Sequence, residues 1–371
     1  MRIVQLANFH APTSGGIRTA LEAIGAGYRQ AGHERVLIVP GRRPGRAEDA
    51  GGTVLHVRGA RLRRTPYRCI VDRRPVHQLL DELRPDVVEV SDKLTLRWVG
   101  RWARRHGVAA VLFSHERIDA ALAPHLPTST PLSSIADRWN RKWADDFDAI
   151  VCCSAFAAEE FTRIGAQPVR VPLGVDLERF RPLDAQPPVA GPSAPLRLVV
   201  VARLSAEKEI DHVVEAVRVL GARGRAVDLQ IAGAGPRLAA LRRQATDLPI
   251  RFVGHQPRPR IAELLGTADV AIAPGPAETF GLAALEALAC GTPVVVRAEG
   301  GCRELIDHSV GVAAVGRPDA MATAIETVAA LPREATRLAA RRRAEQFSWA
   351  TTVSRLLSLH HDLHVRRAVS V

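Results

Sequence analysis

The sequence predicts an α/β protein made of two Rossmann-like, doubly wound domains that face each other across a cleft. The chain has 371 residues, and a single hydrophobic core usually stops growing at about 250 to 300 residues, so two domains are expected. Short apolar runs alternate with helix-length segments along almost the whole chain, which is typical of parallel sheets covered by helices. A stretch rich in Pro, Gly and Ala divides this alternation into two similar halves.

The first domain is expected at residues 1–180. Its first apolar run, residues 3–6, leads through the turn Ser14-Gly15-Gly16 into a segment with apolar residues at helical spacing. Ser154 is placed to cap a helix. In a parallel sheet of this kind, ligands bind at the carboxyl ends of the strands. Further short strands are expected at 36–39, 54–57, 87–90, 109–113 and 150–153.

The second domain is expected at 196–348, after a linker at 181–195 that contains the residues DAQPPVAGPSAP. Its predicted strands and helices follow the same alternation as those of the first domain. The final segment, 349–371, begins with an amphipathic pattern, which predicts a helix that packs back onto the first domain. The strands are expected at 198–201, 229–232, 250–253, 270–273 and 294–296, and the helices at 210–222, 236–245 and 281–290.

Composition indicates a globular protein without a membrane span. The chain is 47% hydrophobic and 24% charged. No apolar stretch approaches the ~20 residues that a spanning helix needs. The first strand begins at Arg2, which leaves no room for a signal sequence, so we expect a cytoplasmic protein. The five cysteines show no C-x-x-C spacing, which favours buried thiols over disulfides.

The net charge of +12 comes mainly from arginine, because only three of the 51 basic residues are lysines. Part of this bias reflects genome composition. What remains is local, since residues 42–74 hold ten arginines against three acidic residues. We call these ten the basic cluster: Arg42, Arg43, Arg46, Arg58, Arg61, Arg63, Arg64, Arg68, Arg73 and Arg74.

The sequence ETFGLAALE places two carboxylates, Glu278 and Glu286, eight residues apart. Glu278 falls in the loop after the strand at 270–273. Gly281 can open a helix whose free N–H groups and positive dipole end attract phosphate. The alternative is a Glu278 that caps the helix and a Glu286 that is solvated.

A second loop at the same edge of the same predicted sheet carries two cations, Arg203 and Lys208, five residues apart. The planar fork of arginine and the point charge of lysine suit the charge that builds on a departing nucleoside diphosphate. The alternative is a solvated pair of cations with Glu207 as its partner.

These residues, with the Gly15-Gly16 turn and the stretch Pro172-Leu-Gly-Val-Asp176, together resemble the retaining GT-B glycosyltransferases of family 4. The resemblance extends from Met1 to about Trp349. Within the family, the chain is most similar to actinobacterial GDP-mannose-dependent phosphatidylinositol-mannoside α-mannosyltransferases. The stretches that carry this likeness are SGGIRTA, EVSDKLTLR, SHERID and APGPAETFGLAALEALACGTP.

The resemblance implies that the second domain binds a nucleotide sugar, expected to be GDP-mannose, and the first domain the acceptor. Arg203 and Lys208 would bind the donor diphosphate. Glu278 would hold hydroxyls of the transferred sugar, and Glu286 would bind the ribose. The remaining donor-binding residues are expected to be Gly16, Gly254, Thr279, Phe280, Gly281 and Leu282.

His115 follows the strand at 109–113, and the resemblance places it near the reacting carbon of the sugar. Its neutral imidazole can accept a hydrogen bond from a hydroxyl. The alternative is a structural histidine. On the acceptor side we expect Asn8, Arg18 and Arg68.

The resemblance implies no metal or other cofactor, although Asp146-Phe147-Asp148 has the D-x-D form of a metal-binding motif. These carboxylates precede the strand at 150–153, at the amino end of the sheet, and are expected to be solvated. Arg203, Lys208 and the helix terminus would neutralise the leaving group instead.

The expected activity is therefore retaining transfer of a hexose by a front-face route. The expected transfer is of mannose from GDP-mannose to a phosphatidylinositol mannoside or related glycolipid, by a protein that is peripheral on the inner face of the plasma membrane. The basic cluster would contact the anionic lipid, and Trp98 and Trp102 are either an interfacial edge or part of the core. The alternatives are a soluble acceptor, a nucleotide-sugar epimerase of the same architecture, and a nucleic-acid-binding protein. Nucleic acid is not expected as a partner, because Tyr67 is the only Phe, Trp or Tyr in residues 42–74, which leaves little to stack on bases.

Overall fold

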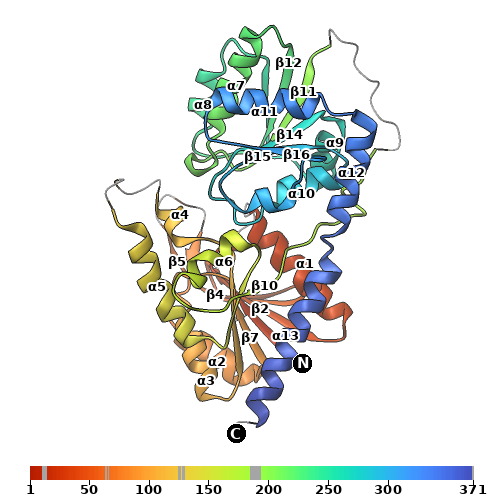
Figure 1. Cartoon of the computed structure of the whole chain (residues 1–371). Helices are drawn as coiled ribbons and strands as arrows, with labels where there is room; N and C mark the ends of the chain where they lie inside the picture. The colour runs from red at the N-terminus through yellow and green to blue at the C-terminus, as the bar shows by residue number, and fades with distance from the viewer. Residues whose placement is uncertain are drawn as a thin grey trace. The chain divides into compact units, whose positions relative to one another are not determined.

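The computed structural model describes residues 1–10, 15–62, 65, 67–123, 127, 130–183 and 194–369. Within it the chain forms two compact units (Figure 1), which we call the first and the second unit. The first unit comprises residues 1–174 and 349–371, and the second comprises residues 175–348. Ser14, Arg63, Arg64 and residues 184–193 of the expected linker lie outside the described residues.

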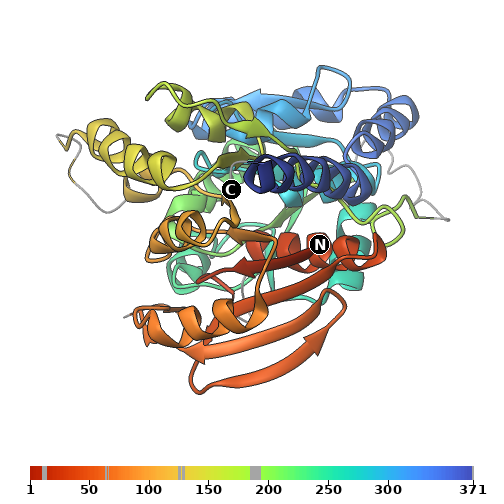
Figure 2. The ribbon, with the colours of Figure 1, turned by 90° about the horizontal axis from the view of Figure 1, so that it is seen from below.

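The first unit is built on an eight-stranded sheet of order β10-β9-β8-β7-β1-β2-β4-β3. The pairs are parallel except β3 with β4. The red-to-orange strands β1, β2, β3 and β4 are twisted relative to one another in Figure 2, as neighbouring strands of L-residues usually are. The strands are β1 (Arg2–Leu6), β2 (Glu34–Gly41), β3 (Gly45–Asp49), β4 (Gly52–Arg58), β7 (Val87–Val90), β8 (Ala109–Ser114), β9 (Ala149–Cys152) and β10 (Val169–Arg170), and a separate hairpin pairs β5 (Ala60–Arg61) with β6 (Arg68–Cys69).

The central parallel strands β1, β7, β8 and β9 are short runs of mainly buried side chains, because helices between them cover the sheet. The edge strand β10 is exposed. The strand β3 was not predicted. Its five residues, GRAED, are half-buried or exposed and pair on one side only, so they carry no apolar pattern to reveal it. The helices of this unit are α1 (Gly16–Gln30), α2 (Arg74–Leu83), α3 (Trp98–Arg105), α4 (Ile118–Leu122), α5 (Leu132–Asp146), α6 (Ala155–Thr162) and α13 (Trp349–Val369).

The helix α13 is remote in sequence from the other parts of the first unit, yet it packs against α1 (Figure 1). Its side chains Leu356 and His360 are fully buried. Gly27 of α1 permits the contact, because a Cβ there would lie 2.4 Å from Val353 Cγ2. The Thr352 hydroxyl also donates to the Pro172 carbonyl at 2.8 Å.

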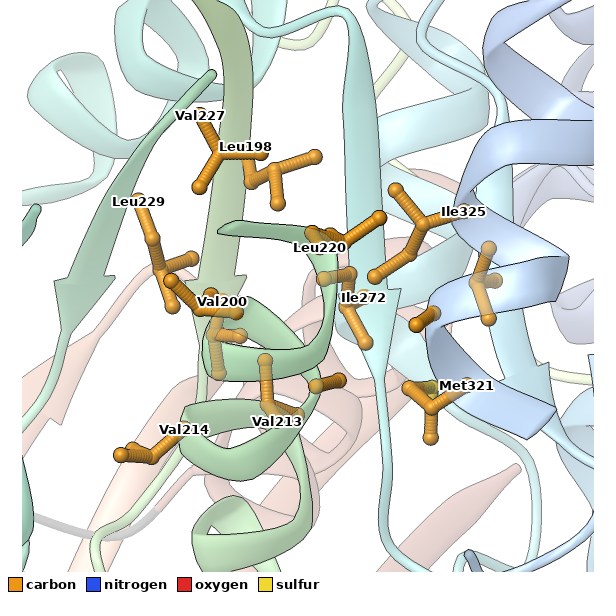
Figure 3. Close-up of a cluster of buried hydrophobic side chains, with 14 of the residues drawn as sticks. Leu198, Val200, Val213, Val214, Leu220, Val227, Leu229, Ile272, Met321 and Ile325 are labelled. Atoms are coloured by element: carbon orange, nitrogen blue, oxygen red, sulfur yellow. The ribbon is translucent and has the colours of Figure 1, made fainter. Parts of the chain in front are cut away.

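The second unit has a six-stranded parallel sheet of order β13-β12-β11-β14-β15-β16. Its core lies between this sheet and the helices α7 and α11, where leucine, valine, isoleucine and methionine side chains interlock (Figure 3). The strands are β11 (Leu196–Val201), β12 (Val227–Ala232), β13 (Ile250–Gly254), β14 (Val270–Ala273), β15 (Val294–Arg297) and β16 (Gly311–Ala314). The helices are η2 (Ala206–Lys208), α7 (Ile210–Ala222), α8 (Leu238–Gln244), α9 (Arg258–Thr267), α10 (Leu282–Ala289), η3 (Gly301–Leu305), α11 (Pro318–Ala329) and α12 (Arg333–Glu345).

Trp98 and Trp102 are core residues, each 4% exposed. Of the two alternatives for these positions, the core is confirmed and the interfacial edge is wrong, because α3 turns both rings towards the sheet and leaves only its arginines outside. The Trp102 indole N–H donates to Asp81 Oδ1 at 3.2 Å. Of the eight described members of the basic cluster, seven are exposed and Arg68 is half-buried. None of the helices in the described part of the chain is both long and apolar enough to cross a bilayer.

Candidate active site

In the second unit, two loops with charged side chains lie next to each other at the carboxyl edge of the sheet. They follow β11 and β14, which are hydrogen-bonded neighbours. The first loop carries Arg203 and Lys208, and the second carries Glu278. The parallel pairing of β11 and β14 therefore brings together residues that are 70 positions apart in sequence.

Lys208 and Glu278 form an ion pair between Nζ and Oε1. Both side chains are largely shielded, at 22% and 28% exposure. Burial by itself lowers the pKa of Lys208, but the Glu278 carboxylate outweighs it and holds the pKa above its usual value. Lys208 is thus fully charged at neutral pH, and its ammonium group donates across to Glu278 of the neighbouring loop.

Arg203 lies on the solvent side of the same loop, with its side chain 50% exposed. Its guanidinium pairs with Glu207 Oε1, which also accepts from the Ser205 hydroxyl at 2.6 Å. Burial raises the pKa of Glu207, but Ser205 and Arg203 together lower it below its usual value. This is the Arg203–Glu207 contact that the alternative interpretation expected, but Lys208 takes no part in it and pairs with Glu278 instead.

The residue after Lys208 has an unusual backbone. Glu209 has φ of 46°, in the left-handed region that non-glycine residues rarely adopt. Its carboxylate lies 2.5 Å from Nη1 of Arg297, a side chain only 8% exposed at the end of β15. Arg297 thus holds the turn from which Lys208 projects. The sequence analysis missed this contact, since nothing in the sequence links positions 88 residues apart.

The helix α10 begins as expected at Gly281, its N-cap. Gly281 has φ of 94°, and a Cβ there would lie 2.1 Å from Cys302 Sγ, so only glycine fits. Its neighbour Phe280 is buried. The backbone of Glu278 is held by η3, because Gly301 N donates to the Glu278 carbonyl at 2.6 Å.

Glu286 is buried inside α10, contrary to the alternative of a solvated carboxylate. Its Oε1 accepts from Nη2 of Arg258 at 2.9 Å. Burial raises the pKa of Glu286 to about 7, even though Arg258 acts in the opposite direction. Glu278 does not cap α10 either, because its carboxylate accepts from Nζ of Lys208 and not from an N–H group of the first helical turn.

Gly254 ends β13 with φ of 73°, and a Cβ added there would meet no atom within 4 Å. Its carbonyl accepts from Gly233 N at 2.8 Å, which ties the strand end to β12. The expected donor residues of the second unit therefore come from β11, β13, β14 and α10, all at the carboxyl edge of one sheet.

The first unit holds the other expected residues. Gly16 is the first residue of α1 and is exposed. His115 follows β8, is 8% exposed, and stacks on Phe113 with ring centroids 4.2 Å apart. Burial lowers the pKa of His115 to about 4, against the opposing effect of Glu89. The imidazole is therefore neutral at pH 7.

Each expected acceptor residue has partners within the first unit. Asn8 is buried, and its amide donates to Asp92 Oδ1 and Thr95 Oγ1, both at 3.0 Å. Arg18 pairs with Glu22 on the same helix at 2.6 Å. Arg68 donates to the Gly59 carbonyl at 2.8 Å. For Asn8 these bonds hold the end of β1 against the segment that follows β7.

The two aspartates of the D-x-D sequence are held by arginines rather than solvated as expected. Asp146 accepts from Arg97 at 3.0 Å, and Asp148 pairs with Arg367 of α13. Asp148 also accepts from Ala110 N at 2.9 Å, which links it to β8. Within the described residues, no cluster of histidine, cysteine and acidic side chains is arranged to hold a metal ion.

Comparison with known proteins adds independent information on the whole chain. Residues 15–174 match the family described as "Glycosyl transferase 4-like domain", and residues 186–346 match "Glycosyl transferases group 1". A Mycobacterium tuberculosis protein named GDP-mannose-dependent alpha-(1-6)-phosphatidylinositol dimannoside mannosyltransferase is 46% identical over 368 residues, which cover 96% of this chain and 95% of that protein. The chain belongs to the family 4 glycosyltransferases. This glycosyltransferase is also similar to D-inositol 3-phosphate glycosyltransferase 1 of Catenulispora acidiphila, at 32% identity over 75% of this chain and 72% of that protein.

Solved structures confirm the GT-B fold of the glycosyltransferase. Sucrose-phosphate synthase from Thermosynechococcus elongatus superposes with a TM-score of 0.80 at 19% identity, over 99% of this chain and all of that chain. The catalytic domain of starch synthase IV from Arabidopsis thaliana gives a TM-score of 0.72 at 14% identity, over 98% and 99% of the two chains. At such low identity these likenesses establish the two Rossmann-like units and nothing about the substrates.

Proposed function

We propose that this glycosyltransferase transfers an α-mannosyl residue from GDP-mannose to a phosphatidylinositol mannoside or a related glycolipid. The observation that carries the proposal is the 46% identity to the mycobacterial mannosyltransferase, which extends over both units of the chain. The two charged loops of the second unit supply the cations and carboxylates that the diphosphate and hydroxyl groups of such a donor require.

In this proposal the second unit binds the donor. Arg203 and Lys208 neutralise the diphosphate, and the free N–H groups at the start of α10 add the positive end of its dipole. Glu278 accepts hydrogen bonds from hydroxyls of the mannose, and Glu286 from those of the ribose. The ion pairs of these carboxylates with Lys208 and Arg258 keep each acceptor oriented before the donor arrives.

The backbone around Gly281 and the open face of Gly254 complete the proposed donor site. Thr279, Phe280, Gly281 and Leu282 would lie against sugar and phosphate, and the absence of a side chain at Gly254 leaves room for the base. From the first unit, Gly16 would approach the diphosphate, while the neutral His115 would accept a hydrogen bond from the sugar. Asn8, Arg18 and Arg68 remain the proposed acceptor contacts.

We further propose transfer with retention of configuration and without a metal ion. The bond between the anomeric carbon and the diphosphate oxygen breaks, and the acceptor oxygen forms the new glycosidic bond on the same face. Its proton passes to an oxygen of the departing diphosphate. The role of the protein is to stabilise the charge on that leaving group with Arg203, Lys208 and α10.

A water-soluble acceptor is the second candidate, and the 32% identity to an enzyme that glycosylates D-inositol 3-phosphate is the observation in its favour. The lower identity makes it the weaker one. With a glycolipid acceptor, the enzyme would work as a peripheral protein at an anionic membrane surface. The basic cluster remains one predicted contact with it.

The test is a set of parallel incubations with radiolabelled GDP-mannose. One receives detergent-dispersed phosphatidylinositol dimannoside, another D-inositol 3-phosphate, and a third no acceptor, and each is repeated with labelled UDP-glucose. The proposal expects a labelled lipid from GDP-mannose only. Labelling of the soluble acceptor alone would move the assignment to the second candidate, and release of free sugar without a glycoside would contradict transfer.

A further inference from the structure

One face of α5 carries apolar and basic side chains in the same stripe. Ile135, Arg138, Trp139 and Lys142 follow the spacing i, i+3, i+4, i+7, so they share one side of the helix, and all four are exposed. The side of the helix next to this stripe, which includes Ala136 and Trp143, is buried against the unit. Arg141, three residues after Arg138, borders this stripe on the side away from Trp139. We define the α5 face as the stripe Ile135, Arg138, Trp139 and Lys142 together with Leu94 and the bordering Arg141.

The apolar members of this face are unusual for a solvated surface. Ile135 is 43%, Trp139 40% and Leu94 38% exposed, and they are three of only eight large hydrophobic side chains exposed in the described part of the chain. Leu94 adjoins the indole, because the Trp139 N–H donates to the carbonyl of the preceding residue, Lys93, at 2.9 Å. This bond uses the one polar atom of the indole and leaves its ring as an apolar surface.

The position of the Trp139 ring is fixed from beneath. Lys93 is itself buried, and its Nζ lies 2.7 Å from Glu160 Oε2, a carboxylate with no exposed surface. Glu160 Oε1 in turn accepts from the backbone N–H groups of Ile118 and Asp119 at 2.7 and 3.0 Å. The exposed ring therefore sits on a rigid base, which lowers the entropy lost when it binds a partner.

The basic members of the α5 face are not neutralised by the protein. Arg138, Arg141 and Lys142 form no ion pair with any described residue. The nearby acids on the same helix are engaged elsewhere, since Asp137 pairs with Arg163 at 2.6 Å and Asp146 with Arg97. Asp145 is exposed at the far end of α5, where its charge is one helical turn from Arg141. The face thus combines an apolar centre with a surplus of positive charge.

From this geometry we infer that the α5 face is a docking surface for an anionic lipid bilayer. Tryptophan and aliphatic side chains enter the boundary between headgroups and acyl chains, and the arginines and lysine contact the lipid phosphates. Leu94 follows β7 at the carboxyl edge of the sheet, the edge where the acceptor is proposed to bind. The inference rests on the proposed glycolipid acceptor and identifies the surface that would meet the membrane carrying it.

The first experiment measures sedimentation with vesicles of phosphatidylcholine, with and without phosphatidylinositol. Each basic side chain at a membrane surface contributes about fivefold to binding, so the triple variant Arg138→Gln, Arg141→Gln, Lys142→Gln should bind phosphatidylinositol vesicles about 100-fold more weakly. The matched comparison is Arg237→Gln, Arg242→Gln, Arg243→Gln, which removes the same charge from exposed positions of the second unit and should leave vesicle binding unchanged.

The second experiment uses the fluorescence of Trp139. Of the five tryptophans, Trp98, Trp102 and Trp143 are buried, Trp349 is half-buried and Trp139 is exposed. Trp139 should therefore account for most of a blue shift and of the loss of acrylamide quenching when vesicles bind. Trp139→Phe should remove this response while the protein keeps its circular dichroism spectrum. Trp139→Ala should in addition weaken vesicle binding, since an apolar contact is lost.

These measurements separate the surface from the activity. Unchanged binding of the α5 triple variant, loss of binding only in the comparison variant, or equal binding to neutral and anionic vesicles would each overturn the inference. Transfer to detergent-dispersed acceptor needs no vesicle, so its absence in the unmodified enzyme would reject the proposed function alone. A normal transfer assay with a Trp139 that stays quenchable on vesicles would reject the α5 face alone.

Discussion

At the scale of single residues, the proposed donor side chains hold one another in place before any ligand binds. Lys208 pairs with Glu278, and Arg258 with Glu286. In each pair the hydrogen bond uses Oε1 of the glutamate, so Oε2 can accept a hydroxyl of the donor without prior rearrangement of the loop. The residue types and their spacing were readable in the sequence, but these partnerships were not.

Replacing either member of the first pair should stop transfer while the fold persists. We expect Lys208→Ala and Glu278→Ala to lower kcat/KM at least about 100-fold, because each removes a charged contact to the donor in a shielded site. The control is Glu263→Ala, which removes an exposed glutamate from a surface ion pair of the same unit. Thermal unfolding should show that all three variants are folded, and near-normal turnover of Lys208→Ala would contradict its assignment.

Glu286 should make the stability of the ligand-free protein depend on pH. Its pKa is about 7 in the folded state and near 4.3 when unfolded, so between these values the folded protein binds more protons than the unfolded one. Stability should therefore fall as the pH rises from about 4.5 to 7, by up to about 3 kcal/mol. Urea unfolding should show that this loss disappears in Glu286→Gln, and an identical pH profile for both proteins would contradict the buried protonated form.

At the scale of the elements, the start of α10 depends on a residue from another turn. Gly281 is left-handed and lies against Cys302 of η3, so the helix can begin at this point only when no side chain is present. The sequence placed Gly281 correctly as the opening of the helix. The five cysteines were predicted only as buried thiols. Nothing in the sequence indicated that Sγ of Cys302 is the atom that excludes a side chain at position 281.

The contact between Gly281 and Cys302 predicts a coupled pair of substitutions. Gly281→Ala should destabilise the second unit by at least about 2 kcal/mol, through its positive φ and the overlap with sulfur. Adding Cys302→Ala moves the nearest atom of residue 302 to 3.4 Å from the new Cβ, so the double variant should be more stable than the sum of the single effects. A double-mutant cycle in guanidinium measures the coupling, and strict additivity would show that the sulfur is not the obstacle.

The edge strand β3 and the helix α5 show a different limit of sequence reasoning. The residues of β3 resemble those of a loop, and the exposed residues of α5 resemble those of a solvated helix. The sequence analysis therefore predicted neither the strand nor the exposed apolar side of the helix. The tryptophans on α3 had the opposite problem, because a Trp-x-x-x-Trp spacing with flanking arginines suits both an interface and a core. Only the packing of α3 against β7 and β8 decides that these rings are buried.

At the scale of the whole molecule, α13 is part of the first unit although the second unit precedes it in the chain. Leu356 and His360 are completely buried there. His360 Nε2 lies 2.9 Å from Oε1 of Glu89, which also accepts from the Tyr28 hydroxyl at 2.7 Å. Burial by itself raises the pKa of Glu89, but these partners lower it below the usual value. The C-terminal helix thus completes the core of a unit that begins at residue 1.

Loss of packing in α13 should weaken the first unit specifically. Leu356→Ala is expected to cost about 2 to 5 kcal/mol, as other fully buried leucines do. The control is Leu338→Ala on α12, which is 52% exposed and should change stability by less than about 0.5 kcal/mol. Hydrogen exchange resolved by peptide should show faster exchange in β1, β7 and α1 of Leu356→Ala, and faster exchange confined to residues 175–348 would contradict the assignment of α13.

The charge of the donor site predicts that transfer needs no divalent cation. Arg203, Lys208 and the N-terminus of α10 supply positive charge at the proposed diphosphate position, and Asp146 and Asp148 are already paired with arginines. Transfer should therefore continue at an undiminished rate in excess EDTA. A loss of activity that Mg²⁺ or Mn²⁺ restores would show that a metal neutralises the leaving group.

The sequence by itself determined the α/β class, the GT-B resemblance, most strands of both sheets and the loop that carries Lys208, because these depend on local apolar patterns and on short motifs. Tertiary structure alone decided which charges pair. Arg258, Arg297 and Cys302 were not foreseen as neighbours of Glu286, Glu209 and Gly281, since parallel strands join residues tens of positions apart through register and helix packing. The same holds for the burial of Trp98 and the exposure of Trp139, which depend on the side that each helix turns to the sheet.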